Sequence, residues 1–416
     1  MKKNILTTWQ PALCLALVLF FSSCIKDNCR RTYRIYTPVY ENISTLRQQV
    51  KSSAVAPVAN TGKLYINGQW IFLNEVNKGI HVIDNSQPTH PVKTSFIKIP
   101  GNIDMYVRNN TLYADLYSDL VAADISNPKN ISVSKFLPDI FPQRAVYMRP
   151  GGGMDSTEVI TGWTTRDTSI DCAADLSRLP CPNCQYMDIY AAQSSVPAVV
   201  KSSGVAGSMA RFAAVDNYLY AVTTADLNIV DISNAPMPRF VKRQSIGWDI
   251  ETIFPYNNKL FIGAGSSMRV YSLQDPQNPV QASFNGHWCS RDPVIVDGNY
   301  AYVTLHDADG CNVKINQLEV YNLSMGSTPV LVNTYPLTRP QGLSKDGNLL
   351  FICDDGLKIY DVKDPGNAQL LSHTKLSDSY DAIAYNNILY MVTKDGLYQY
   401  SYQDPAKPTL LSKLLK

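Results

Sequence analysis

Polar side chains recur at one place in this sequence, roughly five or six residues ahead of a tight-turn signal such as Asp-Asn or Asp-Gly. These residues are Asp104, Arg144, Arg211, Glu251, Asp292, Gln341 and Asp381. Carboxylate, guanidinium and amide groups collected in one ring would bind a polar ligand, and a carboxylate pair would suit glycoside cleavage. The alternative is a structural role, in which each side chain bonds only to the backbone beside it.

Two tryptophans occupy equivalent positions close to these polar residues. Trp248 and Trp288 each stand nine residues before a turn signal, at Asn257 and Asp297. The charged residues that follow them are Asp249, Glu251, Arg291 and Asp292. Exposed indoles beside charged groups form a platform on which a sugar ring stacks while its hydroxyls are bonded. Alternatively, both indoles are buried between neighbouring sheets, which is the commoner environment of tryptophan.

The chain has nine cysteines, of which Cys14 lies within the N-terminal leader. In an exported protein we expect disulfides, with Cys289 paired to Cys311 and a bridge among Cys172, Cys181 and Cys184. The CxxC spacing of Cys181 and Cys184 leaves a redox or zinc role as alternatives. Cys353 ends an apolar run and is expected to be a buried free thiol.

Motifs for common chemistries are missing from the sequence. It contains no GxSxG, SxxK, HExxH or glycine-rich phosphate loop, and its five histidines are scattered. We therefore expect no cofactor and no metal site. The net charge of +2 argues against a nucleic-acid partner.

The elements that position these residues repeat along the chain. The segment LNIVD ending at Asp231 has counterparts IHVID, LVAAD, MDIYA, MRVYS, LEVYN, LKIYD and LYQYS, which end at residues 84, 124, 191, 272, 322, 361 and 401. A period near 40 residues marks a repeat architecture. Turn signals divide each repeat into four short antiparallel strands, and a proline recurs after the third. Because that third strand is apolar on both faces, the sheets must stack face to face, as the blades of a β-propeller do.

Eight copies predict eight four-stranded blades, with seven as the alternative because the third repeat is irregular. In that repeat Gly151–Gly153 replaces the usual turn, and a loop of about residues 164–184 is inserted. A second insertion spans about residues 306–316. Both insertions fall on the face where the innermost strands begin, so we place the candidate site there.

The N-terminus resembles a lipoprotein leader. Lys2 and Lys3 precede an apolar stretch that ends at Ser22-Ser23-Cys24, which predicts cleavage before Cys24 and lipidation of its thiol. We therefore assign residues 1–23 to a signal peptide, 24–60 to a lipidated tether and lead-in, and 61–416 to the propeller. Within the lead-in, the spacing of Ile43, Leu46 and Val50 predicts one short amphipathic helix.

The runs LNIVDIS and LVAADISNP resemble the LVIVD repeat family of β-propeller proteins. Together with the leader, they make the chain similar to LVIVD-repeat lipoproteins of the Bacteroidetes type. That resemblance implies a fold and no established activity. It also implies an exported protein on the outer membrane, facing either the periplasm or the cell surface.

Three functions follow from these features. The first is a membrane-anchored binding or scaffold protein that recognises a glycan, a peptide or a partner protein at the channel rim. The second is an extracellular polysaccharide-active enzyme that uses rim carboxylates, and the third is a structural subunit of an envelope complex. Binding is the leading hypothesis because no catalytic set is visible.

Overall fold

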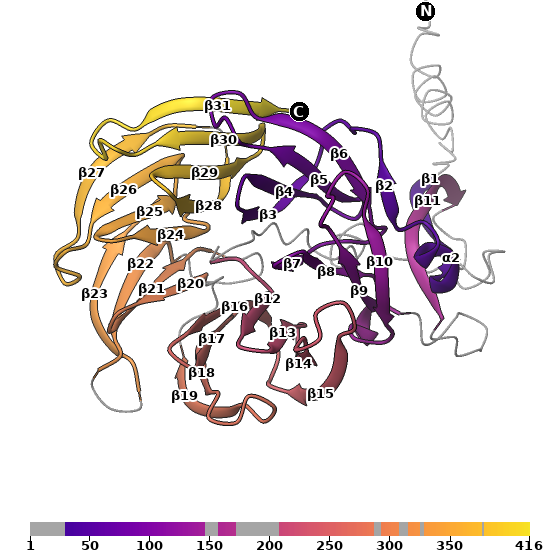
Figure 1. The fold of residues 1–416 in the computed structure, drawn as a ribbon, viewed down its shortest axis with the longest axis horizontal. Coiled ribbons are helices and arrows are strands. Elements are labelled where there is room, and N and C mark those ends of the chain that lie inside the picture. Colours follow the sequence, from indigo (N-terminus) through magenta and orange to yellow (C-terminus); the bar gives the residue numbers. More distant parts are fainter. Residues whose placement is uncertain are drawn as a thin grey trace, which may run out of the picture.

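A computed structural model describes residues 30–145, 157–171, 208–286, 293–307, 315–324, 328–376 and 378–416. Within these residues, seven four-stranded antiparallel units stand in a ring, the seven blades of a β-propeller (Figure 1). Each blade is built from consecutive strands, with the first innermost and the fourth outermost. The molecule is therefore an all-β propeller, as the repeat predicted.

The blades have the following bounds. Blade 1 contains β3 (Thr61–Asn67), β4 (Trp70–Glu75), β5 (Gly79–Asp84) and β6 (Val92–Lys98). Blade 2 contains β7 (Met105–Arg108), β8 (Thr111–Leu116), β9 (Asp119–Asp124) and β10 (Ser132–Leu137). Blade 3 contains β12 (Phe212–Val215), β13 (Tyr218–Val222), β14 (Asp226–Asp231) and β15 (Arg239–Ser245). Blade 4 contains β16 (Ile250–Tyr256), β17 (Lys259–Ala264), β18 (Ser267–Ser272) and β19 (Val280–Gly286). Blade 5 contains β20 (Val294–Asp297), β21 (Tyr300–Leu305), β22 (Gln317–Asn322) and β23 (Val330–Pro336). Blade 6 contains β24 (Leu343–Asp346), β25 (Leu349–Cys353), β26 (Leu357–Asp361) and β27 (Gln369–Thr374). Blade 7 contains β28 (Ser379–Tyr385), β29 (Ile388–Thr393), β30 (Gly396–Ser401) and β31 (Thr409–Leu415).

The local signals explain these strands. The first hairpin of most blades turns through residues with positive φ, among them Asn109, Asp216, Asn257 and Gly298. Asparagine, aspartate and glycine adopt that region at low cost, so these positions terminate the strands. The third strand is buried on both faces, since Leu227, Ile229 and Val230 are all fully shielded from solvent. Apolar clusters accordingly lie between neighbouring blades.

The prediction of eight blades is wrong, and seven, the named alternative, is correct. The third repeat of the sequence does not form a blade in the described residues. Its segment β11 (Glu158–Asp171) instead pairs along its length with β1 (Arg30–Asn42), more than a hundred residues earlier. Arg144, which we expected to open a blade strand, ends the short 3-10 helix η1 (Pro142–Arg144). The MDIYA segment lies outside the described residues.

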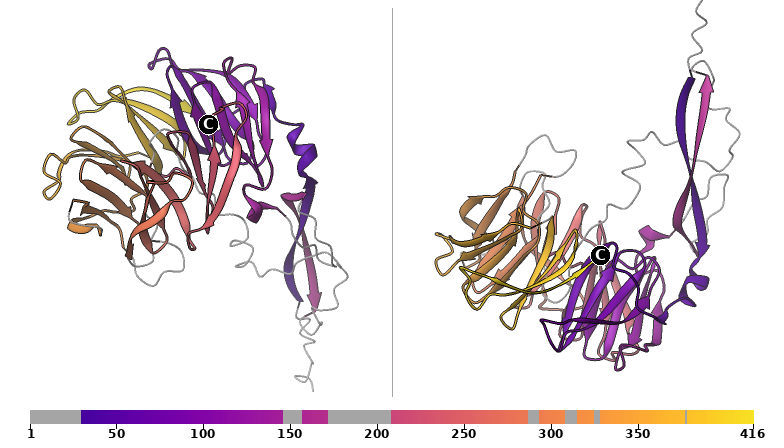
Figure 2. Two further views of the ribbon diagram at one scale, coloured as in Figure 1. Left: turned by 60° about the horizontal axis from the view of Figure 1, so that its bottom comes forward. Right: turned by 90° about the horizontal axis from the view of Figure 1, so that it is seen from above.

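The β1–β11 pair is a two-stranded ribbon that stands out from the propeller (Figure 2). Its base is attached by α2 (Ile43–Arg47), a single helical turn within the segment where a short helix was expected. Ile43, Leu46, Val50 and Val159 join the apolar cluster of blades 1 and 2. Arg47 adds an ion pair of 2.6 Å to Asp119. After this turn, β2 (Lys51–Ser53) adds a fifth strand to the outer edge of blade 1.

The ring closes between blades 7 and 1 without exchanging a strand. Blade 7 ends with β31, which runs along its outer edge. An apolar cluster containing Leu64, Ile71, Tyr390 and Leu397 joins the two blades. Side-chain packing between blades 7 and 1 therefore closes the ring, without a strand shared between them.

Candidate functional site

The innermost strands place the predicted polar residues at one mouth of the central channel. Asp104 and Arg211 immediately precede β7 and β12, while Glu251 and Asp381 lie at the second and third positions of β16 and β28. Gln341 lies two residues before β24. We call this mouth, together with the loops around it, the rim face. Asp104 and Arg211 belong to a buried polar network, and Glu251 and Gln341 line an open cavity. Asp381 belongs to neither: it is buried, and its Oδ1 accepts the N–H of Ala382 at 2.8 Å.

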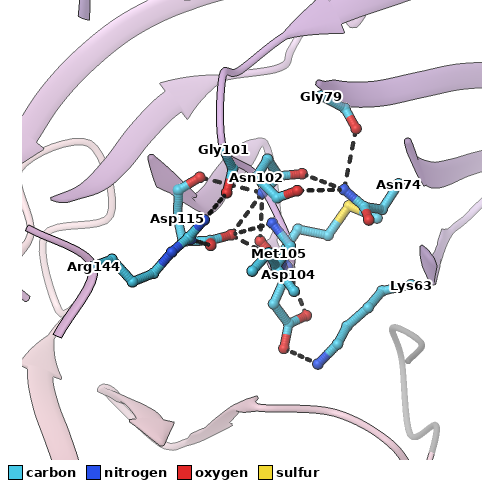
Figure 3. Close-up of polar contacts among 10 residues, drawn as sticks. Lys63, Asn74, Gly79, Gly101, Asn102, Asp104, Met105, Asp115 and Arg144 are labelled. Atoms are coloured by element: carbon cyan, nitrogen blue, oxygen red, sulfur yellow. Dashed lines mark hydrogen bonds and ion pairs between the residues drawn. The ribbon is translucent and has the colours of Figure 1, made fainter. Parts of the chain in front are cut away.

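The buried polar network comprises Lys63, Asp104, Asp115 and Arg144, which Figure 3 shows. Arg211 joins it through a hydrogen bond to Asp104. Lys63 forms an ion pair with Asp104, whose Oδ2 also accepts the backbone N–H of Arg211 at 2.7 Å. Arg144 forms an ion pair with Asp115 and donates to the carbonyl oxygen of Gly101 at 2.6 Å. The network thus connects blades 1, 2 and 3 around their inner strands.

Asp115 organises the loop that leads into blade 2. Its Oδ1 accepts hydrogen bonds of 2.8 Å from the backbone N–H groups of Ile103 and Asp104 and from Nδ2 of Asn102. Asn102 Oδ1 in turn accepts from Asn74 Nδ2 at 2.7 Å, as Figure 3 shows. With its acceptors filled from the protein itself, this carboxylate acts as a structural group.

Burial governs the electrostatics of this network. It lowers the pKa of Lys63, against the opposing influence of Asp104, and it raises the pKa of Asp104. Burial also lowers the pKa of the Arg211 guanidinium, which Asp104, Glu251 and Asp115 counteract. The cost of removing these charges from water is offset by pairing, so loss of one partner would leave the other uncompensated.

The chain itself crosses the channel beside this network. Ser208, Met209 and Ala210 are buried just ahead of β12. The N–H of Leu343 in blade 6 donates to Ser208 Oγ at 2.8 Å, and the N–H of Ile253 in blade 4 donates to the carbonyl oxygen of Ala210 at 2.8 Å. This segment therefore spans from blade 3 to the opposite side of the ring.

A cavity of about 450 Å³ lies on the rim face beside this crossing segment. Blades 4 to 7 and the loops between them contribute to it, with Glu251 from blade 4, and Met209 comes from the crossing segment. The remaining polar lining includes His306, Arg339, Gln341, Asp355, Asp378 and Tyr380. Such a volume is within the range of small-ligand sites.

Short hydrogen bonds hold the walls of this rim cavity. Buried Asp354 accepts the N–H of Arg339 at 2.7 Å and pairs with Lys358 Nζ at 2.6 Å. Thr304 Oγ1 donates to the carbonyl oxygen of Gln341 at 2.7 Å, and Ser379 Oγ donates to that of Gly356 at 2.7 Å. The loops that line the cavity are therefore attached both to the blades and to one another.

Trp248 is 73% exposed, so the expectation of a buried wedge is wrong for this residue. It lies on the loop from β15 to β16, where Gly247 and Asp249 both have positive φ. Three residues further on, Glu251 lines the rim cavity. An indole left largely in water beside a polar cavity is available to contact a ligand.

Several predicted residues lie outside the described residues. They are Cys24, Cys172, Cys181, Cys184, Trp288, Cys289, Arg291, Asp292 and Cys311. The disulfides and the second half of the tryptophan platform stay predictions. Cys353 is a buried free thiol, as expected, and burial raises its pKa well above the ordinary value.

The structure adds residues that the sequence pattern missed. Lys63 and Asp115 lie outside the repeated polar position, and Asp355, Asp378 and Tyr380 come from the loops around it. One signal in the sequence could have identified such loop residues. In each blade the first strand begins near the turn between the second and third strands, so that turn also faces the rim. Asp354-Asp355-Gly356 is an acidic turn of this kind.

These features define the class of protein as a seven-bladed β-propeller with a polar cavity at one mouth of its channel. The sequence matches the family described as the LVIVD repeat at residues 206–244 and 291–311. The protein is therefore a β-propeller that contains LVIVD repeats. A comparison with curated proteins finds no match.

Solved structures of similar fold share little sequence with this chain. The computationally designed Ika8 protein is 11% identical, with a TM-score of 0.51 over 87% of this chain and 89% of that one. Sqt1 of Saccharomyces cerevisiae is 8% identical, with a TM-score of 0.50 over 90% of this chain and 87% of its own. PorZ, a bacterial surface component of the type-IX secretion system of Porphyromonas gingivalis, is 12% identical, with a TM-score of 0.47 over 86% of this chain and 39% of its own. Likeness at this level bears on the fold alone.

Proposed function

We propose that the protein is a membrane-anchored binding propeller that takes a glycan at the rim cavity. The observation that carries this proposal is the convergence of Glu251, Asp355, Asp378 and Tyr380 on one cavity, with the exposed Trp248 three residues before Glu251, on the loop that leads into β16. Carboxylates and hydroxyls bond sugar hydroxyls, and an exposed indole stacks on a sugar ring. A peptide or a partner protein is the alternative ligand for the same site.

The anchor part of the proposal rests on the leader. Small residues directly before Cys24, after a charged and then an apolar stretch, support lipidation of that cysteine and export to the outer membrane. Among the described residues, no helix is long and apolar enough to span a membrane. Labelling with a radioactive fatty acid should mark the wild type but not Cys24→Ala, and equal labelling of both would contradict the anchor.

An enzyme acting on polysaccharide is the second candidate, and the carboxylate contacts weigh against it. Asp104, Asp115 and Asp354 each form an ion pair with a lysine or arginine. Asp355 lies 3.5 Å from Lys375 Nζ. A catalytic acid needs a raised pKa and an opposing carboxylate at a defined separation, whereas ion-paired acids favour binding or structure.

A glycan array tests the ligand class directly. We expect the purified propeller to bind a defined subset of glycans, and Trp248→Ala to weaken that binding at least about tenfold. Because the indole is 73% exposed, the same substitution should change the melting temperature by less than about 2 °C. Tyr385→Ala, at an exposed tyrosine that is the last residue of β28 and lies away from the rim face, serves as the matched control and should leave binding intact.

A large loss of stability in Trp248→Ala, with full binding in the folded fraction, would contradict the site. Binding to peptides alone on a parallel peptide array would assign the site to the alternative ligand. Binding to neither array would contradict a ligand-binding function of either kind.

A further inference from the structure

The base of the β1–β11 ribbon is fixed to the propeller through the turn that leads into α2. The N–H of Ile43 donates to the carbonyl oxygen of Thr157 at 2.8 Å. Asn42 caps α2 by accepting the N–H of Ser44 at 2.9 Å, and its Nδ2 donates to Thr157 Oγ1 at 3.1 Å. Because these bonds join both strands of the ribbon to the helix, they hold the ribbon and α2 in one arrangement.

This base lies at the rim end of blade 2. Arg47 of α2 forms its ion pair with Asp119, the first residue of β9, directly after the turn between the second and third strands. In the same turn, the ring of Tyr117 lies 5.1 Å from the guanidinium of Arg144, which belongs to the buried polar network. After α2 the chain stays at this end, since β2 pairs with the last three residues of β6, ahead of the loop that leads to β7.

From this base the ribbon runs away from the propeller (Figure 2). β1 has 13 residues, so at about 3.3 Å per residue the ribbon is about 40 Å long. Partway along it, a bidentate ion pair of 2.8 and 3.0 Å between Arg34 and Asp167 joins the two strands. The free end, where Arg30 pairs with Asp171, therefore lies beyond the rim face of the propeller.

The lipid anchor inferred from the leader belongs to this free end. Cys24 precedes Arg30 by six residues, which reach at most about 20 Å when fully extended. A lipid on Cys24 would therefore keep the free end of the ribbon close to the membrane. The rim face, from which the ribbon rises, is nearer to that end than the opposite face is.

We propose that the ribbon is a strut that holds the propeller with its rim face toward the anchoring membrane. In this orientation the rim cavity faces molecules that the same membrane displays, and the opposite face is turned away from it. The strut rests on the lipid anchor of the proposed function, and it adds the side of the propeller that meets the membrane.

Energy transfer to the membrane tests this orientation. The whole lipidated protein is incorporated into vesicles of phosphatidylethanolamine and phosphatidylglycerol that carry a lipid-linked acceptor dye. A donor dye is coupled to p-azidophenylalanine introduced at Lys394 or at Asn387, which are exposed residues at the two ends of β29. Lys394 follows β29 in the turn on the rim face, and Asn387 precedes it in the hairpin on the opposite face.

Transfer from position 394 should be at least about twice that from position 387, because the six residues of β29 separate the two positions by about 20 Å. Removing residues 32–35 together with their partners 166–169 shortens the ribbon by about 13 Å and should raise transfer from both positions. Equal transfer from the two positions, or stronger transfer from 387, would overturn the strut. Unchanged transfer in a folded shortened variant would overturn it as well, and the comparison of the two positions needs no shortened variant.

Flotation of the same vesicles measures attachment separately from orientation. Cys24→Ala is the control and should stay unbound, without energy transfer. A wild type that does not float with the vesicles would contradict the anchor and the strut together. A wild type that floats but shows equal transfer from both positions would contradict the strut alone.

Discussion

Residues at the start of the innermost strands have different roles because their neighbours differ. Asp104 is fully occupied by Lys63 and by backbone N–H groups, while Glu251, one register position earlier in its own blade, lines an open cavity. The repeat register predicted the positions of both residues from the sequence. It could not predict Lys63, because that residue becomes a partner of Asp104 only when blades 1 and 2 come together.

Glu75 provides a residue-scale test through pH. Burial by itself would raise its pKa, but His81 and the N–H groups of Ala59 and Asn60 lower it to about 2. A carboxylate with a lowered folded-state pKa stabilises the fold above its ordinary pKa of 4.5, and this stability is lost as pH falls from 4.5 through 2. The carboxylate should therefore contribute fully at neutral pH.

We expect Glu75→Gln to reduce the free energy of unfolding by about 1.5–3 kcal/mol at pH 7, because the substitution removes the buried negative charge that His81 and the two backbone N–H groups stabilise. The difference from wild type should shrink below pH 4.5, as measured by urea denaturation at a series of pH values. A constant difference across that range would contradict the role of the carboxylate.

At the scale of elements, local signals predicted the hairpins and the four-strand unit, and the structure confirms both. They failed for the third repeat. The β-branched residues of Glu158–Asp171 favour a strand, and they suit a blade or a partner such as β1 equally well. Whether this segment joins a blade or pairs with β1 depends on residues more than a hundred positions away, and no local sequence pattern records that pairing. The loops around the rim were missed for the same reason.

The start of β30 offers an element-scale test with a matched control. Gly396 has φ of +141°, and a Cβ there would overlap the carbonyl oxygen of Leu414 in the neighbouring strand. Gly347, in a hairpin of blade 6, has φ of +53° and open space around it. We expect Gly347→Ala to cost about 1–2 kcal/mol from backbone conformation alone. Gly396→Ala should cost about 1–3 kcal/mol more, because the strand must shift. Equal costs in thermal denaturation would contradict the close approach of the strands.

At the scale of the whole molecule, the period of the repeat predicted a ring but miscounted its blades by one. The number of blades is set by how sheets pack around the channel and by how the ring closes, and neither is local. Blades 1 and 7 close the ring through an apolar cluster. Truncating a side chain in this cluster should therefore lower the stability of the protein as much as truncation in any other hydrophobic core.

Leu64→Ala tests this closure, since Leu64 is fully buried in the cluster between blades 1 and 7. We expect a loss of about 2–5 kcal/mol, as for other large-to-small core substitutions. Leu410→Ala, at a residue 44% exposed on β31, is the control and should change stability by less than about 0.5 kcal/mol. A neutral Leu64→Ala in urea denaturation would show that the ring does not depend on this contact.

The central claim is that the rim cavity binds the ligand, and hydrogen–deuterium exchange tests it most directly. The protein would be compared with and without a saturating concentration of the strongest glycan from the array. We predict slower exchange at residues 248–252, 338–341 and 378–380, which contain Trp248 and much of the cavity lining. Exchange in the outer strands should be unchanged. Protection confined to the outer strands or to the face opposite the rim would contradict the account.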